Sequence, residues 1–350
     1  MESSAPVAVD ATTSFGEGIS GVGVYSRELL HGLATSGFAG RWEWFYRSQR
    51  YWRALTRPKP PNVTRRLLTD SWGNRGASLF HGLNQRLPRR RFRRQVVTFH
   101  DLFVLSGEYS TPDFRERFAA QAREAAAGAD LIIAVSAFTA GQIEAYLKVP
   151  RERIRVVHHG VVQRAVVRRG LPDLPREKVV LCVGAIQRRK NQAALVRAFR
   201  AMPPDWTLVL AGSQGFEAEN ILGEIVSQVT ARVRVTGYLS DDEIAAWYAR
   251  ASIFVFPSFD EGFGMPVLEA MAAGVPVIAG NCSALPEVCG GAALLVDPHS
   301  DEEIANAMLL LANDENCREQ LLRKGSERAR EFTWDKTISA TVAVYREALG

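Results

Sequence analysis

The chain has 350 residues, 47% of them hydrophobic and 23% charged, which is the composition of an ordinary globular protein of about two domains. No stretch reaches the roughly 18 uninterrupted apolar residues of a membrane span, and residues 1–14 lack the basic segment and apolar core of a signal peptide. The four cysteines form no C-x-x-C pair and are too few for a disulfide framework in a chain of this size. We therefore expect a cytoplasmic protein with reduced thiols.

The net charge of +5 conceals an uneven distribution, because residues 1–175 contain 26 Lys and Arg against 15 Asp and Glu, whereas the remainder contains 17 against 23. Much of the excess lies in QRLPRRRFRRQ, Gln85–Gln95, whose basic residues run from Arg86 to Arg94. Such a run is either a solvated loop or a contact for an anionic membrane or a phosphorylated acceptor. No nucleic-acid partner is expected, since neither a recognised binding motif nor interleaved aromatic side chains accompany the arginines.

The first half of the chain alternates short apolar runs with helical patterns, which is typical of parallel sheets covered by helices. One helix is expected from Val24 to Ser36, ended by Gly37, and another begins after Thr111 with Pro112 in its first turn. The strands are expected at Val7–Val9, Trp42–Tyr46, Gln95–Phe99, Leu131–Val135 and Ile154–Val157.

The segment from Gly160 to Glu177 is rich in Pro and Arg and breaks this rhythm, so we interpret residues 163–177 as a linker between two domains. Beyond it the alternation restarts. A capping box at Ser240–Glu243 predicts a helix, and the last helix is expected over Asp335–Leu349. The strands of this half are expected at Leu181–Ala185, Thr207–Gly212, Val233–Gly237, Ile253–Ser258, Val275–Ala279 and Ala293–Val296.

The segment EGFGMPVLE, Glu261–Glu269, has the features of an anion site. A buried strand is expected to end at Pro257, a glycine-rich loop follows, and a helix begins near Pro266, so the amides of the first helical turn favour a phosphate. The glycines allow the backbone to approach a ligand closely. Glu261 precedes this helix and Glu269 lies about one turn inside it, where each carboxylate can accept hydrogen bonds from adjacent hydroxyl groups of a sugar or a ribose.

This segment resembles the signature of family 4 of the retaining glycosyltransferases, in which two glutamates enclose an E-G-F-G-x-P-x-x-E core. Other segments match the family in the expected order, and the resemblance covers nearly the whole chain. They are VGAIQRRKN, VTGYLSDDEIAAWYARA, ADLIIAVSAFT and RIRVVHHGV.

The family has the GT-B fold. The resemblance therefore implies an α/β chain of two Rossmann-like, doubly wound parallel-sheet domains facing a central cleft, with a C-terminal helix that crosses back to the first domain. Residues 1–162 would bind the acceptor and residues 178–334 the nucleotide sugar, with residues 335–350 forming the last helix.

By this resemblance, Glu261 contacts hydroxyl groups of the transferred sugar and Glu269 contacts the ribose of the nucleotide. Arg189 and Lys190 face the diphosphate, where two cations and a helix N-terminus can take the place of a metal ion. No D-x-D motif occurs in the sequence, so we expect neither a metal nor a cofactor. Further donor contacts are expected from Gly262, Phe263, Gly264, Met265, Leu268 and Tyr238.

The chain departs from many relatives at Ala185, where they have arginine. Relatives that read G-T-L-E-P-R-K-N place an arginine directly before the lysine, so Arg189 is the expected substitute. Arg188 either points to solvent or shares that role. Tyr238 matches the loop that meets the base, mostly through backbone groups, and its ring either lies there or packs in the core.

In the first domain, Gly21 and Gly23 match the glycines that bring a loop close to the donor phosphate and the acceptor in this family. The string Gly16–Gly21 also spells G-x-G-x-x-G, the dinucleotide-binding fingerprint. A nicotinamide cofactor is not expected, because the next strand ends in Tyr46-Arg47 without the acidic residue that holds a ribose.

His100 and Asp101 follow directly after a predicted strand, at the position where open parallel sheets bind ligands. The resemblance implies that His100 contacts the donor sugar or its phosphate, with Asp101 orienting it, and a structural histidine is the alternative. His81, at another expected strand end, has the same two interpretations. His158 and His159 stand where relatives often have Pro-Asn, which leaves donor contacts there open.

We therefore predict a retaining, metal-independent transferase that moves a hexose from a nucleoside diphosphate sugar to a glycan or lipid-linked acceptor. The G-x-x-x-x-R-K-N variant favours GDP-mannose, and a UDP-sugar is the alternative within the family. Two other classes stay open. One is a glycoside hydrolase that uses Glu261 and Glu269 as acid and nucleophile, and the other is a catalytically inactive sugar-nucleotide sensor.

Overall fold

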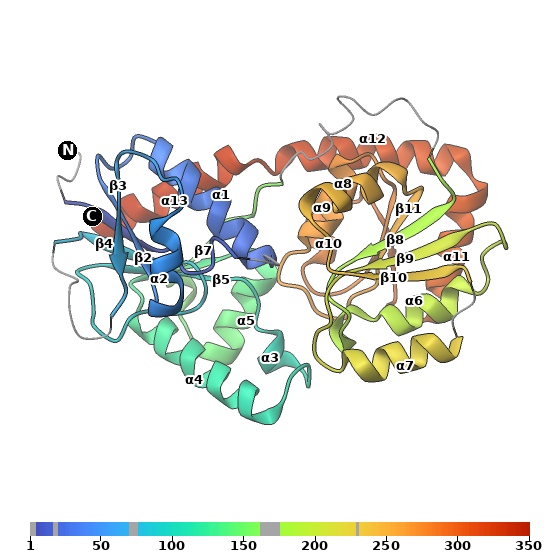
Figure 1. Cartoon of the computed structure of the whole chain (residues 1–350), viewed down its shortest axis with the longest axis horizontal. Coiled ribbons are helices and arrows are strands. Elements are labelled where there is room, and N and C mark those ends of the chain that lie inside the picture. The colour runs from blue at the N-terminus through green and yellow to red at the C-terminus, as the bar shows by residue number, and fades with distance from the viewer. Residues whose placement is uncertain (1–4, 17–19, 70–75, 162–175, 229–230) are drawn as a thin grey trace. The chain divides into compact units, whose positions relative to one another are not determined.

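A computed structural model of the protein is shown in Figure 1. The chain divides into two compact units, one made of residues 1–160 with residues 333–350 and the other of residues 161–332. The linker predicted at residues 163–177 lies outside the described residues except for Arg176 and Glu177. The structure describes residues 5–16, 20–69, 76–161, 176–228 and 231–350.

The described part of the first unit forms a parallel sheet of seven strands in the order β3-β2-β1-β4-β5-β6-β7. The sequence runs outward from β1 to β3 on one side and from β4 to β7 on the other, which is the doubly wound arrangement. The strands are β1 (Val7–Asp10), β2 (Trp42–Tyr46), β3 (Val63–Leu67), β4 (Leu79–Gly82), β5 (Gln95–Phe99), β6 (Leu131–Ala134) and β7 (Ile154–Val156). The helices are α1 (Gly21–Thr35), α2 (Ser48–Leu55), α3 (Phe103–Ser106), α4 (Pro112–Gly128), α5 (Ala137–Leu147), the 3-10 turn η1 (Arg151–Arg153) and α13 (Trp334–Leu349).

Two features of this unit differ from the sequence-based expectations. Strand β3 was not predicted, because it is the edge strand and exposes Thr64, Arg66 and Leu67, so its sequence contains no apolar run. Helix α1 begins at Gly21 rather than at Val24. The residues expected to form a glycine loop, Gly21 and Gly23, therefore lie in the first turn of a helix, where the amide groups have no acceptor within the helix.

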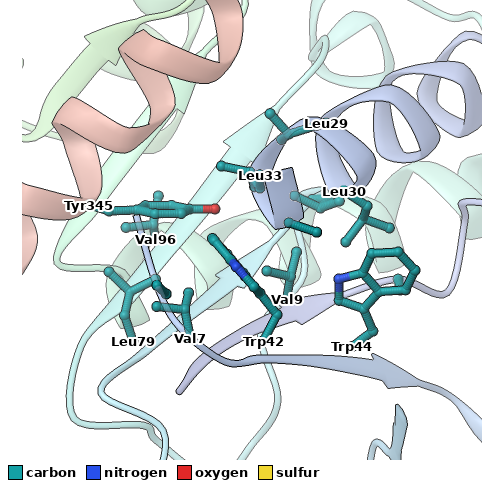
Figure 2. Close-up of a cluster of buried hydrophobic side chains, with 14 of the residues drawn as sticks. Val7, Val9, Leu29, Leu30, Leu33, Trp42, Trp44, Leu79, Val96 and Tyr345 are labelled. Carbon is teal, nitrogen blue, oxygen red and sulfur yellow. The ribbon is translucent and has the colours of Figure 1, made fainter. Parts of the chain in front are cut away.

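The core of the first unit lies between the sheet, α1 and the C-terminal helix α13 (Figure 2). Alternate residues of a strand point to opposite faces, so Val7 and Val9 contact this core whereas Ala8 joins a second cluster on the other face. Tyr345 of α13 is fully buried among these side chains. The C-terminal helix thus packs on the first unit and is an integral part of it.

The described part of the second unit forms a parallel sheet of six strands in the order β10-β9-β8-β11-β12-β13. Among the described residues of the whole chain, no helix combines the length and apolar character of a membrane span. The strands are β8 (Val179–Val183), β9 (Thr207–Ala211), β10 (Val233–Gly237), β11 (Ile253–Phe256), β12 (Val277–Gly280) and β13 (Leu294–Val296). The helices are the 3-10 turn η3 (Arg188–Lys190), α6 (Gln192–Phe199), α7 (Ala218–Gln228), α8 (Asp241–Arg250), α9 (Met265–Ala272), α10 (Leu285–Cys289), α11 (Asp301–Asn313) and α12 (Glu315–Glu331).

Candidate active site

The loop between β11 and α9 carries the motif singled out in the sequence. Helix α9 begins at Met265 with Pro266 in its first turn, and Gly264 at its N-cap has a φ of +101°, which side chains other than glycine rarely adopt. A Cβ atom on Gly264 would also lie 2.7 Å from Leu285 Cδ2. The glycine is therefore required both by the backbone conformation and by the space beside α10.

Glu261 lies buried between two cations. Lys190 Nζ is 2.5 Å from Glu261 Oε1, and Arg189 Nη1 is 3.0 Å from Glu261 Oε2. Both cations belong to η3, directly after β8, and β8 pairs with β11 in the sheet. Parallel strands that are neighbours bring the loops at their carboxyl ends together, which explains how residues 71 positions apart meet.

The loop around this cluster is held by several further contacts. Arg189 Nη1 donates to the Asp260 carbonyl at 2.6 Å, and Lys190 Nζ lies 4.6 Å from the centre of the Phe256 ring. Asn191, in the left-handed conformation with a φ of 58°, donates its side-chain amide to the carbonyls of Pro257 and Pro298. Because these groups are fixed before a ligand arrives, the cations are preorganised.

The electrostatics of this cluster follow from burial and from the cations. Burial by itself raises the pKa of Glu261, but Arg189 and Lys190 outweigh it and hold that pKa below its usual value. Burial lowers the pKa of Lys190, although Glu261 opposes this effect. With all three groups ionised, two cations face one carboxylate, and the surplus positive charge favours an anionic ligand.

Glu269, half-buried on α9, is held by a residue that the sequence analysis did not single out. The hydroxyl of Tyr248 on α8 lies 3.1 Å from Glu269 Oε2 and 3.3 Å from the Pro266 carbonyl. Tyr248 itself is almost completely buried. The apolar period of α8 indicates that this residue faces the core, but no pattern in the sequence indicates which group its hydroxyl reaches.

The other predicted donor-binding positions of this unit differ in exposure. Phe263 is buried, and the centre of its ring lies 5.8 Å from that of Phe332. Leu268 is buried as well, so neither of these two side chains is exposed to a ligand. Gly262 is buried and Met265 is half-buried. Tyr238 is 54% exposed, so the alternative that its ring packs in the core is wrong.

Two further observations concern the start of the second unit. Arg188 is exposed whereas Arg189 is buried beside Glu261, which separates the two neighbouring arginines. Gly212, at the end of β9, was not singled out from the sequence. A Cβ atom there would lie 2.0 Å from the Gly184 carbonyl oxygen, so the loops after β8 and β9 can approach only because this residue is glycine.

In the first unit, His100 is buried and its environment defines its protonation. Its Nε2 lies 2.7 Å from the Leu83 carbonyl, which can only accept, so Nε2 carries the hydrogen. Burial lowers the pKa of His100 to about 4, and the neutral ring then has an acceptor at Nδ1. Such a ring can accept from a sugar hydroxyl. The predicted neighbour Asp101 is half-buried, and the hydrogen bond that His100 Nε2 donates to the Leu83 carbonyl orients the ring.

His100 also lies in an aromatic cluster. The ring of Tyr25 contacts His100 and His159 edge-on at 4.7 Å each, and the two imidazoles stack at 5.3 Å. His81 is fully buried, with Nδ1 2.6 Å from the Tyr345 hydroxyl and Nε2 2.8 Å from Thr98 Oγ1. Both ring nitrogens of His81 are engaged inside the protein, which supports its structural interpretation.

The structure thus gathers Glu261, Arg189 and Lys190 into one cluster of the second unit, with Glu269 farther along α9. Gly21, Gly23 and His100 belong to the first unit. Among the described residues, no three His, Cys, Asp or Glu side chains are grouped as ligands for a metal ion.

Comparison with known proteins identifies the class of protein that carries this fold and this site. A model described as Glycosyltransferase Family 4 matches residues 19–163, and one described as Glycosyl transferases group 1 matches residues 177–314. The O-antigen chain mannosyltransferase B of Escherichia coli is 32% identical over 283 residues, which cover 77% of this chain and 74% of that protein. The serotype-specific mannosyltransferase WbdA of Escherichia coli is 29% identical over 272 residues, covering 71% of this chain but only 33% of WbdA.

Solved structures show the same fold at lower identity. Sucrose-phosphate synthase from Thermosynechococcus elongatus has a TM-score of 0.77 at 23% identity, with 98% of both chains covered. The Anabaena protein HepE, solved with UDP and glucose, has a TM-score of 0.73 at 18% identity, with 98% of this chain and 99% of HepE covered. The fold and the matched families define a glycosyltransferase with two Rossmann-like α/β domains of the GT-B type. This chain belongs to glycosyltransferase family 4.

Proposed function

We propose that this enzyme transfers mannose from GDP-mannose to a glycan or lipid-linked acceptor, with retention of the anomeric configuration and without a metal ion. The observation that carries the proposal is the buried cluster of Arg189, Lys190 and Glu261 at the start of α9. The relatives named mannosyltransferases support the sugar. In this proposal residues 178–334 bind the nucleotide sugar and residues 1–162 bind the acceptor.

The cluster can stabilise a leaving diphosphate. Lys190 and Arg189 are preorganised cations, and the first-turn amides of α9 add a partial positive charge beside them. Arg189 takes the place of the arginine that many relatives have at the position of Ala185. Glu261 would accept hydrogen bonds from hydroxyl groups of the transferred sugar, and Glu269 from the ribose.

The reaction exchanges one bond for another at the anomeric carbon. The bond between that carbon and the β-phosphate oxygen breaks, and its electron pair leaves with GDP. The acceptor hydroxyl attacks from the same face, and its proton passes to the departing phosphate oxygen. Nothing in this scheme requires a protein nucleophile, so Glu261 serves as a binding group.

The ionisation of Glu261 argues against a glycoside hydrolase. The general acid of a hydrolase needs a raised pKa so that it is protonated near neutral pH. Arg189 and Lys190 instead lower the pKa of Glu261. A UDP-sugar stays the alternative donor, and HepE was solved with UDP.

The basic run Arg86–Arg94 is proposed as a contact for anionic lipid. Its arginines are exposed, whereas Phe92 is buried and stacks on Phe80 at 4.7 Å, which holds the loop on the sheet. Arg91 pairs with Asp130 at 3.1 Å. Beside the run lies a cavity of about 380 Å³ whose polar lining consists of Arg89, Arg91, Gln95, Gln121 and the acidic Glu124.

A thermal-shift panel with GDP, UDP, ADP and their sugars tests the donor, because a ligand that binds the folded state raises Tm by mass action. We expect GDP and GDP-mannose to give the largest shifts. Transfer of labelled mannose to an acceptor extract should persist in EDTA. A larger shift with UDP, or strict dependence on a divalent ion, would overturn the corresponding part of the proposal.

A further inference from the structure

Helix α2 presents large apolar side chains to solvent. Of its eight residues only Ala54 is buried, whereas Trp52 is 71% exposed and Leu55 is 46% exposed. Leu67, at the end of the neighbouring edge strand β3, is 38% exposed. Tyr51 contacts Trp52 edge-on at 5.5 Å and is itself half-buried, so the indole is the side chain that projects outward.

The same segment is strongly basic. Residues 47–67 contain six arginines and one lysine and no acidic residue. Arg53 and Arg57, on and just after α2, are exposed. Arg66 on β3 pairs with Glu43 of β2 at 3.1 Å. Exposed apolar and cationic side chains therefore occur together on α2, just after it, and at the end of β3. We call this set the α2 surface: Arg53, Trp52, Leu55, Arg57 and Leu67.

This surface is preformed. Arg65 donates to the carbonyls of Leu55, Arg57 and Pro58, which fixes the chain at the end of α2. Asn62 donates its side-chain amide to the Ala34 carbonyl at 2.8 Å, which ties the following loop to α1. Because the backbone is already ordered, docking need not order it first.

We propose that the α2 surface docks on an anionic lipid bilayer, with Trp52 and Leu55 entering the headgroup region and Arg53 and Arg57 meeting lipid phosphates. Tryptophan is enriched at membrane interfaces, and amphipathic helices that combine Trp or Leu with Arg lie in that plane. Basic residues near the surface add attraction to anionic lipids. The inference deepens the proposed function, since a lipid-linked acceptor would be presented at such a surface.

The α2 surface differs from the basic run Arg86–Arg94. The run buries its large apolar residue, Phe92, with Phe45 and Phe80, and exposes arginines alone. Ala54 of α2 packs with the core of α1 instead. The two clusters occupy opposite faces of one sheet, so the segments are anchored on opposite sides of it. Of these two described segments, the α2 surface is the one that combines charge with exposed side chains that can insert into a bilayer.

The test is sedimentation of the full chain with vesicles of phosphatidylcholine, with and without phosphatidylglycerol. We expect the wild type to bind the anionic vesicles. The double variant Trp52→Ser/Leu55→Ser should bind them about tenfold more weakly than the wild type. Phe114→Ser is the matched control, because Phe114 is a 44% exposed aromatic on α4 of the same unit. Its binding should equal that of the wild type.

A charge pair of variants separates the two basic segments. Arg53→Gln/Arg57→Gln should weaken binding roughly tenfold, whereas Arg90→Gln/Arg93→Gln removes the same charge from the run and should have the smaller effect. Lipids with brominated chains should quench tryptophan fluorescence, and Trp52→Phe should remove most of that quenching. The change from Trp to Phe keeps an aromatic ring, so binding itself should persist.

Several outcomes would overturn the inference. One is failure of the wild type to bind anionic vesicles, and another is binding by Trp52→Ser/Leu55→Ser that is as strong as that of the wild type. A third is a larger loss of binding in Arg90→Gln/Arg93→Gln than in Arg53→Gln/Arg57→Gln. The fourth is a preference of the protein for duplex DNA over vesicles. Thermal shifts by nucleotides, measured without vesicles, keep the two proposals apart. Vesicle binding without a thermal shift by nucleotides would refute the proposed function alone. A thermal shift by nucleotides without vesicle binding would refute the docking of the α2 surface alone.

Discussion

The hydroxyl of Tyr248 and the carboxylate of Glu269 meet at 3.1 Å across the interface of α8 and α9. The contact orients a carboxylate that is half-buried and lies within the first two turns of α9. A carboxylate held in this way is already ordered before a ligand binds. It can therefore accept hydrogen bonds from ribose hydroxyl groups without a further loss of conformational entropy.

Glu269→Ala should weaken nucleotide binding. A hydrogen bond to a charged group contributes about 1.5–3 kcal/mol, so Kd should rise roughly ten- to hundredfold. Isothermal titration with GDP measures it. Glu303→Ala on α11 is the control for a carboxylate near a helix start, because Glu303 accepts from the Asp297 amide and should leave GDP binding unchanged. Unchanged affinity in Glu269→Ala would refute the ribose role.

Tyr248→Phe should reduce the preference of the enzyme for a ribose over a dideoxyribose. The variant keeps the buried ring and removes only the hydroxyl, so Glu269 loses its orientation while the core stays filled. We expect GDP affinity to fall a few fold, about 1 kcal/mol, and dideoxy-GDP affinity to change little. The measurement is the ratio of the two Kd values.

Tyr345→Phe makes the same chemical change in the first unit, where the hydroxyl contacts His81. It should lower Tm and leave the ratio of the two Kd values as in the wild type. If Tyr248→Phe weakens both nucleotides equally, the tyrosine acts through general packing and not through Glu269.

Lys190→Ala should impair transfer far more than Arg188→Ala, although the two residues are separated by a single position. Lys190 contacts Glu261 and lies in the proposed diphosphate site, whereas Arg188 is exposed. Removing a preorganised charge from a transition-state contact costs about a hundredfold or more in kcat. GDP affinity should fall, and guanosine affinity should not. Equal losses in both variants would contradict the assignment of the cations.

The sequence predicted much of the second unit because its chemistry lies in one continuous motif. The capping box at Ser240 is present in full, and the helix expected near Pro266 begins one residue earlier at Met265. The contact of Glu261 with Lys190 was not predicted, since it depends on which strands become neighbours in the sheet. The residues alone predicted a site for phosphate, and the topology added the ion pairs.

Prediction was weaker in the first unit for a physical reason. Edge strand β3 has Arg65 and Arg66 where an apolar run would reveal a strand, and the first turn of α1 contains two glycines that resemble a loop. The basic residues of segment 47–67 form no single run in the sequence, because the arginines are spaced along a helix, a turn and a strand. Exposure of Trp52 is visible only in the folded chain.

The buried histidines of the first unit should make its stability depend on pH. Burial lowers the pKa of His81 to about 3 and that of His100 to about 4, from an ordinary value of 6.5. The unfolded chain therefore binds more protons than the folded chain below about pH 6.5. The contribution of the two neutral histidines to the free energy of unfolding is fully present above that pH. It is lost as the pH falls toward the pKa values that these histidines have in the folded protein.

His100→Gln tests this dependence, because the amide can still donate to the Leu83 carbonyl but cannot titrate. One pKa unit corresponds to about 1.4 kcal/mol, so between neutral pH and about pH 5 the wild type should lose about 2 kcal/mol more than the variant. Urea unfolding at the two pH values measures the difference. His31→Gln, an exposed position on α1, should keep the wild-type dependence. The same dependence in His100→Gln would mean that His100 titrates normally in the folded protein, and the assignment of a lowered pKa to its buried ring would then be wrong.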